Sequence, residues 1–317
     1  MAVQIRDTSL IEGFKEILTE EDFELHERLK DEYLDNFLFD MPSIYEGFNY
    51  KVEEKDIVVT GYEPDAVKDG KLTIPMIFDG ILYGEDGFKI GNDVLELDLG
   101  RTLVLGSEVF NGTALKSVTG KYLAKLGNNT FSNCVQLRDI DFPVLTSIGD
   151  ETFKECNNLI KVVLPSLRVM GDGVFSGCEY LEECDVHGVR MAGGNTGRQE
   201  APKSIFSECK RLAKLDISGA LTLGERALYG CISLKELNLR LCRSFESYAL
   251  GYCESLETLY LDNIMGFKES ALEGCVSLST INYYGPKNQW EDVMIESEVE
   301  LNVLKNVTVN ANYKDPE

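Results

Sequence analysis

The sequence predicts an α/β repeat fold: a solenoid of coils of about 22 residues, each with a short strand and a short helical or irregular return, and an α-helical N-terminal cap. Two observations predict it. An aromatic residue or leucine recurs in one phase, and the residues around each such anchor repeat one apolar pattern. A fixed period of roughly 20 to 50 residues is typical of solenoids, whose units bury their apolar sides against their neighbours. The anchors are Phe88, Phe110, Phe131, Phe153, Phe175, Phe206, Leu228, Leu250 and Leu272, with gaps of 22, 21, 22, 22, 31, 22, 22 and 22 residues.

Residues 145–165 show what one coil contains. Relative to Phe153, Cys156 stands at +3 and Leu159 at +6, a helical spacing that predicts a short turn of helix on the core. Val162 at +9 and a second aliphatic residue at +11 alternate with polar residues, which is strand spacing. One coil therefore holds one short strand and its return. We expect Phe153 and Leu159 to be buried between adjacent coils.

The other coils keep these positions. Leucine recurs at +6 and cysteine at +3, and glycine is frequent at −4, where we expect a backbone turn that needs freedom in φ. The −4 glycines are Gly84, Gly106, Gly127, Gly149, Gly171 and Gly224.

At these positions the chain resembles the BspA-type leucine-rich repeat family, whose unit reads roughly I-G-x-x-A-F-x-x-C-x-x-L-x-x-I-x-L-P. Residues 123–143, 145–165 and 167–178 match it closely, whereas the last three anchors carry Leu where Phe is usual. Residues 58–75 resemble the opening coil of such arrays, and residues 281–290 resemble their closing segment. The resemblance covers about residues 52–312. It implies a leucine-rich-repeat solenoid that acts as a non-enzymatic recognition surface, and it names no ligand.

Three regions follow from this pattern. Residues 1–48 precede the array, residues 49–284 form the solenoid, and residues 285–317 form a closing segment. In the first region, Leu25, Leu29, Tyr33 and Phe37 make an apolar stripe on an acidic helix. This helix either caps the open end of the solenoid or serves oligomerisation or docking, and both roles need the same stripe.

The charge balance limits the classes of partner. The net charge is −23, which disfavours nucleic acid and anionic membrane surfaces, because both attract clustered Lys and Arg. A protein partner is expected, with a basic or glycan-bearing contact surface. The first thirty residues lack the apolar region of a signal peptide and no apolar stretch approaches ~20 residues, so we expect no membrane insertion and a cytoplasmic location. The alternative is a virion or cell-surface location reached without a signal peptide.

The nine cysteines have a structural explanation. Seven occupy the +3 position, Cys184 occupies +9 in its coil and Cys242 occupies −8, so all nine are expected to be small apolar core residues. No C-x-x-C motif is present, and the 22-residue spacing is unlike that of a zinc site. We therefore expect a single column of buried, reduced thiols and no metal.

Motifs for catalysis are not recognisable. Residues 171–177 and 193–198 lack the spacing of a dinucleotide-binding or phosphate-binding loop. His26 and His187, the two histidines, have no neighbouring nucleophile in a plausible loop. We expect no enzyme activity and no cofactor.

The recognition surface is expected on the strands, because side chains between the strand anchors point out of the sheet. One outward row is Asp141, Val163, Asp185, Asp216, Asn238, Tyr260 and Asn282. A flanking row is Asp139, Lys161, Glu183, Lys214, Glu236, Thr258 and Thr280. From the first row, Asp141, Asp185, Asp216, Asn238 and Tyr260 are the candidate partner-binding residues, and Tyr283 and Tyr284 lie near its aromatic end.

A second candidate recognition site is the segment that lengthens the spacing between the anchors Phe175 and Phe206 to 31 residues. Nine extra residues fall within residues 187–203, which contain Arg190 and Arg198 in an otherwise acidic chain. Insertions in solenoids lie in loops on one face, often the binding face. The insertion is either a contact site or a tolerated surface loop. For the whole chain, the alternative to a recognition scaffold is a structural component of a virion or an adhesive cell surface.

Overall fold

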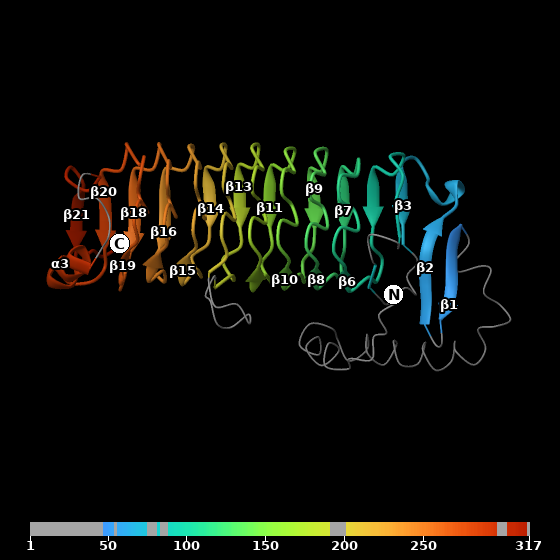
Figure 1. The fold of residues 1–317 in the computed structure, drawn as a ribbon, viewed down its shortest axis with the longest axis horizontal. Coiled ribbons are helices and arrows are strands. Elements are labelled where there is room, and N and C mark those ends of the chain that lie inside the picture. Colours follow the sequence, from blue (N-terminus) through green and yellow to red (C-terminus); the bar gives the residue numbers. More distant parts are fainter. Residues whose placement is uncertain are drawn as a thin grey trace.

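The computed structural model is a straight solenoid whose coils stack along one axis (Figure 1). The structure describes residues 47–53, 56–74, 81–82, 88–190, 201–296 and 303–315. The helices expected before residue 48 and Arg198 in the insertion lie outside these residues. The repeat predicted from the anchors is confirmed, because successive coils pair in register at intervals of one repeat.

Parallel strands form one long face, here called the first face. Each strand pairs with the strand of the next coil, as Val162 does with Cys184 and Cys184 with Leu215. The pairing falls into three consecutive sheets along this face. Its strands are β3 (Lys71–Thr73), β5 (Glu96–Asp98), β7 (Ser117–Thr119), β9 (Asp139–Asp141), β11 (Lys161–Val163), β13 (Glu183–Asp185), β14 (Lys214–Asp216), β16 (Glu236–Leu239), β18 (Thr258–Leu261), β20 (Thr280–Tyr283) and β21 (Thr308–Ala311).

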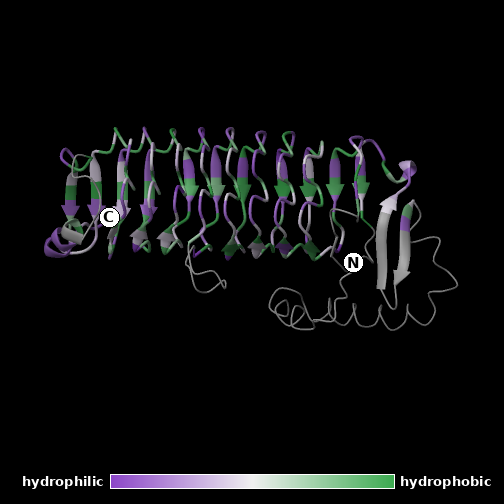
Figure 2. Ribbon diagram, viewed as in Figure 1, coloured by the Kyte–Doolittle hydropathy of each residue, from purple (hydrophilic) through white to green (hydrophobic). Residues whose placement is uncertain are grey.

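Shorter parallel strands form a second face. They place the apolar residue at −5 in the core, as Ile148 and Leu223 illustrate. This face consists of one five-stranded and one three-stranded sheet. Its strands are β4 (Ile81–Leu82), β6 (Val104–Leu105), β8 (Lys125–Leu126), β10 (Ser147–Ile148), β12 (Val169–Met170), β15 (Thr222–Leu223), β17 (Ser244–Phe245) and β19 (Gly266–Phe267). Figure 2 shows apolar segments recurring at the same level from coil to coil.

The third side of each coil, here called the anchor edge, contains residues −2 to +3 around each anchor. Of the two returns predicted, helical or irregular, the structure shows the irregular one, because these residues form turns. The N–H groups of Glu151, Phe153 and Glu155 donate to carbonyl oxygens of the next coil at 2.7–2.9 Å. These amides are satisfied between coils instead of along a helix, which is why a spacing of +3 and +6 does not require a helix.

The anchor edge also has an unusual backbone. The residues at −2 and +2 have positive φ in every coil from Phe110 onward, whether they are glycine or not. For a residue with a side chain this conformation costs roughly 1–2 kcal/mol. The positions are Glu108 and Gly112, Asn129 and Asn133, Glu151 and Glu155, Gly173 and Gly177, Ser204 and Glu208, Arg226 and Gly230, Tyr248 and Tyr252, and Ser270 and Gly274.

Phenylalanine anchors form a continuous stack through the core. From Phe110 to Phe206 the ring centroids of successive anchors lie 5.4–5.6 Å apart. Such contacts contribute about 0.5–1.5 kcal/mol each beyond the burial of apolar area. Phe153 and Leu159 are both fully buried, which confirms the register predicted for their repeat.

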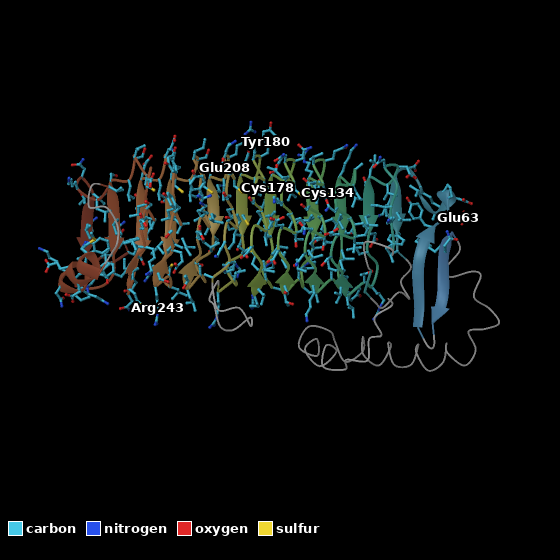
Figure 3. All side chains as sticks on the ribbon, viewed as in Figure 1. Glu63, Cys134, Cys178, Tyr180, Glu208 and Arg243 are labelled. Atoms are coloured by element: carbon cyan, nitrogen blue, oxygen red, sulfur yellow. The ribbon has the colours of Figure 1, made fainter. Side chains whose placement is uncertain are left out.

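Beside this stack runs a column of thiols. All nine cysteines are free and buried. Each of the seven at +3 donates its S–H to the carbonyl oxygen of the preceding coil's anchor at 3.0–3.2 Å, as Cys156 does to Phe131. The predicted column of buried core cysteines is confirmed, and its thiols have a hydrogen-bonding role as well. Figure 3 shows Cys134 and Cys178 between the two edges of the solenoid.

The −4 glycines serve a different purpose from the one expected. Gly127, Gly149, Gly171 and Gly224 do not have positive φ. A Cβ atom added at any of them would lie 2.0–2.5 Å from an atom of another coil. Close approach of neighbouring coils therefore selects glycine here, and freedom in φ does not.

Other elements flank the array. At the N-terminal end, β1 (Phe48–Glu53) and β2 (Asp56–Tyr62) form an antiparallel hairpin, followed by a 3₁₀ turn (Pro64–Ala66). At the other end, helix α3 (Lys287–Glu296) packs Trp290 against the buried Tyr283, with ring centroids 5.3 Å apart. Strand β21 then adds to β20. None of the helices that the structure describes is long and apolar enough to cross a membrane.

Candidate recognition face

Most of the predicted row lies on the outside of the first face. Asp141, Asp216 and Asn238 are exposed at β9, β14 and β16, and Asp185 is half-buried at β13. The C-terminal end of the row differs. Asn282 is buried and accepts a hydrogen bond at 2.9 Å from Asn310, its partner on the neighbouring strand β21.

The aromatic end of the row is not an open platform. Tyr283 is fully buried and points into the core. Tyr260 is half-buried, and its ring lies 6.1 Å from that of Tyr313, which comes from beyond the repeats. A glycan would need an open aromatic surface here, so the expected stacking surface is partly taken by the chain itself.

Two aspartates of the row, Asp185 and Asp216, also hold the turns that follow their strands. The Asp185 side chain accepts the backbone N–H of His187 at 3.2 Å, and Asp216 accepts that of Ser218 at 3.0 Å. In the next coil, Asn238 makes the same contact to Arg240 at 3.3 Å. One carboxylate oxygen of each aspartate is thus structural, and an asparagine satisfies the same requirement.

The flanking row is partly neutralised by its own ion pairs. Lys161 contacts Glu183 at 2.6 Å, and Lys214 lies 3.9 Å from the same carboxylate. The hydrogen bond from Lys161 lowers the pKa of Glu183. Both lysines therefore contact Glu183, and the charge of Lys161 also acts on Asp185.

The His187 imidazole contacts one aspartate of the row. Its Nδ1 lies 2.7 Å from a carboxylate oxygen of Asp185. Burial would raise the pKa of Asp185, but hydrogen bonds from the His187 side chain and backbone outweigh it and lower that pKa. Asp185, His187 and Asp216 have ligand-type atoms within 4.8 Å of one another, the one such trio among the described residues.

The remaining strand residues of the first face are also more acidic than basic. Outward acids are Glu96, Asp98, Asp139, Asp141, Glu183, Asp185, Asp216 and Glu236, against Lys71, Lys161 and Lys214. The described part of this face therefore carries a negative field over β5 to β16.

The residues on either side of the predicted insertion keep their places in the coil. Val189 is buried and donates its N–H to the carbonyl of Val186, as Leu167 does to Leu164 one coil earlier. Val189 therefore occupies the −8 position of its coil, although counting back eight residues from Phe206 would place Arg198 there. Arg190 is exposed in the following position. Residues 191–200, within the predicted insertion, lie outside the described residues.

This placement separates the two predicted sites. Arg190 follows the turn out of the first face, and its carbonyl accepts the Leu221 N–H at 2.8 Å. Asp141, Asp185 and Asp216 lie on the first face itself. The structure therefore does not bring the basic insertion and the aspartates into one row.

The structure contains two clusters of arginine and tyrosine side chains that the sequence analysis did not predict. On the anchor edge, Arg226 lies over Tyr229 and Tyr248 at 5.4 and 5.6 Å. On the first face, Arg240 lies over Tyr284 at 3.8 Å. The 22-residue register could have indicated the second pair, because both residues stand at +12. In Figure 3, Tyr180 lies at the upper edge and Arg243 at the lower edge of the solenoid.

An apolar hollow lies at the C-terminal end, away from the predicted row. Its volume is about 390 Å³, and α3, β21 and the segment between them line it. The lining residues are Trp290, Met294, Leu304, Lys305 and Val309.

Comparison with known proteins identifies the repeat. Residues 101–193 and 198–300 match the BspA type leucine rich repeat region, in six copies. No curated protein matches the chain. A Treponema pallidum (T. pallidum) leucine-rich repeat protein is 19% identical, with a TM-score of 0.42, over 80% of this chain and 96% of that one. A leucine-rich cell surface protein of Faecalibacterium prausnitzii is 14% identical, with a TM-score of 0.30, over 78% and 96%. The pneumococcal vaccine antigen PcpA is 15% identical, with a TM-score of 0.31, over 85% and 98%.

Proposed function

The chain belongs to the BspA type leucine-rich repeat family, and from this membership we propose that it is a non-enzymatic scaffold whose first face binds a basic segment of a protein partner. Members of a repeat family present extended surfaces for recognition. The proposal for this chain rests on the residues of its own first face.

One observation carries the proposal. The row of Asp141, Asp185 and Asp216 presents carboxylates whose neighbouring lysines contact Glu183. Lysine or arginine side chains of a partner would meet these carboxylates two coils apart between Asp141 and Asp185 and one coil apart between Asp185 and Asp216. The expected contribution is about 0.2–1 kcal/mol for each exposed pair, and it falls as salt rises.

The test removes the negative charges of the three aspartates and keeps side chains that can hold the turns after their strands. We expect the triple variant Asp141→Asn, Asp185→Asn, Asp216→Asn to fold normally, because Asn238 holds the equivalent turn in the next coil. A fluorescent deca-lysine peptide is the probe, and anisotropy at low and physiological salt is the measurement. The three charges together should weaken binding by roughly threefold to a hundredfold, from the same pair energies.

A matched control variant removes three acids elsewhere. Glu254, Glu269 and Glu291 are exposed and lie outside the first-face strands. Changing these three to Gln alters the net charge equally. If both variants lose the same affinity, the peptide senses net charge alone and the proposed row is not a site. Light scattering on the same samples would reveal the self-association that an assembly component needs.

A further inference from the structure

The segment after β21 turns back over the first face. Asn312 has a φ of +57°, which ends the strand and redirects the chain. The Asn312 N–H donates to the carbonyl of Gly285 at 2.9 Å, and the Tyr313 N–H to that of Tyr283 at 3.0 Å. Residues 312–315 therefore lie across the end of β20, held by the backbone at one end.

Two side chains of this segment contact the repeats. The Tyr313 ring lies 5.3 Å from that of Tyr284 and 6.1 Å from that of Tyr260, both in edge-to-face geometry. The Asp315 carboxylate accepts a hydrogen bond from the Tyr284 hydroxyl and contacts the Arg240 guanidinium at 3.2 Å. The segment thus joins three successive first-face coils, those of β16, β18 and β20.

The receiving residues, Arg240, Tyr260 and Tyr284, are here called the Arg240 surface. Arg240 and Tyr284 are already organised against each other, with the guanidinium 3.8 Å from the ring centroid. Arginine and tyrosine are the residues most enriched where interfaces concentrate their binding energy. An arginine beside a phenol hydroxyl recognises a carboxylate, and the edges and faces of two tyrosines receive a third aromatic ring.

The contact has the features of a bound peptide that can be replaced. Tyr313 and Asp315 stand two residues apart, the spacing at which an extended chain presents side chains on one side. The side chains of Asp315 and Arg240 remain 61% and 42% exposed, so their ion pair is screened and contributes little to folding.

We propose that the Arg240 surface is a binding site for an extended peptide that carries an aromatic residue and, two residues later, a carboxylate, and that residues 312–315 occupy this site in the isolated chain. An external peptide must displace this segment before it binds. The site is distinct from the aspartate row, and its charge preference is opposite.

The test uses the segment itself as the probe. A fluorescein-labelled peptide of residues 309–317, Val-Asn-Ala-Asn-Tyr-Lys-Asp-Pro-Glu, is titrated with the full chain and with the variant Tyr313→Ala, Asp315→Asn. The variant keeps Arg240, Tyr260 and Tyr284 and frees the site. If the native segment occupies the site about 90% of the time, the variant should bind the peptide about tenfold more tightly than the wild type.

Two controls isolate the surface. Adding Arg240→Gln to the variant should abolish the gain, as should a peptide in which the aspartate is replaced by asparagine. Binding of the deca-lysine probe should be unchanged in all of these variants, which separates failure here from failure of the proposed aspartate row. Circular dichroism establishes that each variant is folded.

The contrary results are equally specific. Equal peptide affinity for wild type and variant, or binding that survives Arg240→Gln, would overturn the proposal. If the double variant does not fold, Asp315→Asn alone removes the ion pair and leaves the Tyr313 contacts. Tighter binding of the labelled peptide by this single variant than by the wild type would support the site. Equal affinity would overturn the proposal and show that residues 312–315 have only a structural role.

Discussion

The thiol column makes the stability of this protein sensitive to alkaline pH. Burial raises the pKa of Cys178, Cys242 and Cys275 from the ordinary thiol value of 9.0 to about 12. Above pH 9 the unfolded chain loses thiol protons that the folded chain keeps. The unfolded state then binds fewer protons, so the free energy of unfolding falls as pH rises from 9 towards 12.

The magnitude follows from these values. Between pH 8 and pH 10, each of the three thiols removes about 1.4 kcal/mol from the free energy of unfolding, or about 4 kcal/mol together. This is a large part of the roughly 5–15 kcal/mol that stabilises an ordinary domain. Below pH 8 the thiols are protonated in both states, so their contribution to the pH dependence disappears.

The assay compares wild type with Cys178→Ser by urea denaturation at pH 8 and pH 10 in the presence of a reductant. A serine hydroxyl can still donate to the Phe153 carbonyl that Cys178 contacts at 3.0 Å, but it does not ionise in this range. Surface lysines and tyrosines titrate equally in both proteins, so their effects cancel. The loss of stability between the two pH values should be about 1.4 kcal/mol smaller in the variant.

An equal loss in both proteins would refute the reasoning, because it would show that the Cys178 thiol ionises as easily in the folded chain as in the unfolded one. A thiol titration in denaturant without reductant provides the companion measurement. We expect nine free groups, and a count of one or three would show that disulfides have formed.

Three further predictions concern the coils. Phe153→Ala should lower the free energy of unfolding by about 3–5 kcal/mol in chemical denaturation, since the ring is fully buried in the anchor stack, and a loss under 1 kcal/mol would contradict that packing. Gly177→Ala should cost about 1–2 kcal/mol, because φ is +75° there and the new Cβ would lie 2.7 Å from the Glu155 carboxylate; Ser176→Ala, at a neighbour without positive φ, is the control. Deleting residues 192–200 should leave the melting temperature nearly unchanged, because Val189 and not Arg198 supplies the buried −8 side chain, and a fall of ten degrees or more would show that the loop braces the coils.

The repeat register was predictable because burial fixes it. Phe153, Cys156 and Leu159 can be recognised in the sequence since each faces the core once per coil, and the structure buries all three. The backbone conformation of the return segment around each anchor was not predictable from the same spacing. An interval of three residues fits a helix, but it also fits stacked turns whose amides bond to the next coil, and apolar spacing does not report where backbone N–H groups are directed.

The candidate site was predictable in part for the same reason. Alternation along the strands correctly placed Asp141 and Asp216 on the outside. It failed at Asn282 and Tyr260, because β21 and Tyr313 lie beyond the last repeat and no periodicity connects them to it.

The junction beside the insertion has a consequence for cooperativity. In an array of this kind each coil is coupled only to its neighbours, and the strength of the weakest junction decides whether the molecule unfolds as one unit. At the coil that carries the insertion, β13 still pairs with β14 and Phe175 still donates to Ile205, but no second-face strand connects β12 to β15 among the described residues. The described coupling across this junction is carried by the first face and the anchor edge, so we expect substitutions that weaken the pairing of β13 with β14 to divide unfolding into two transitions, one for the coils on each side of residue 190.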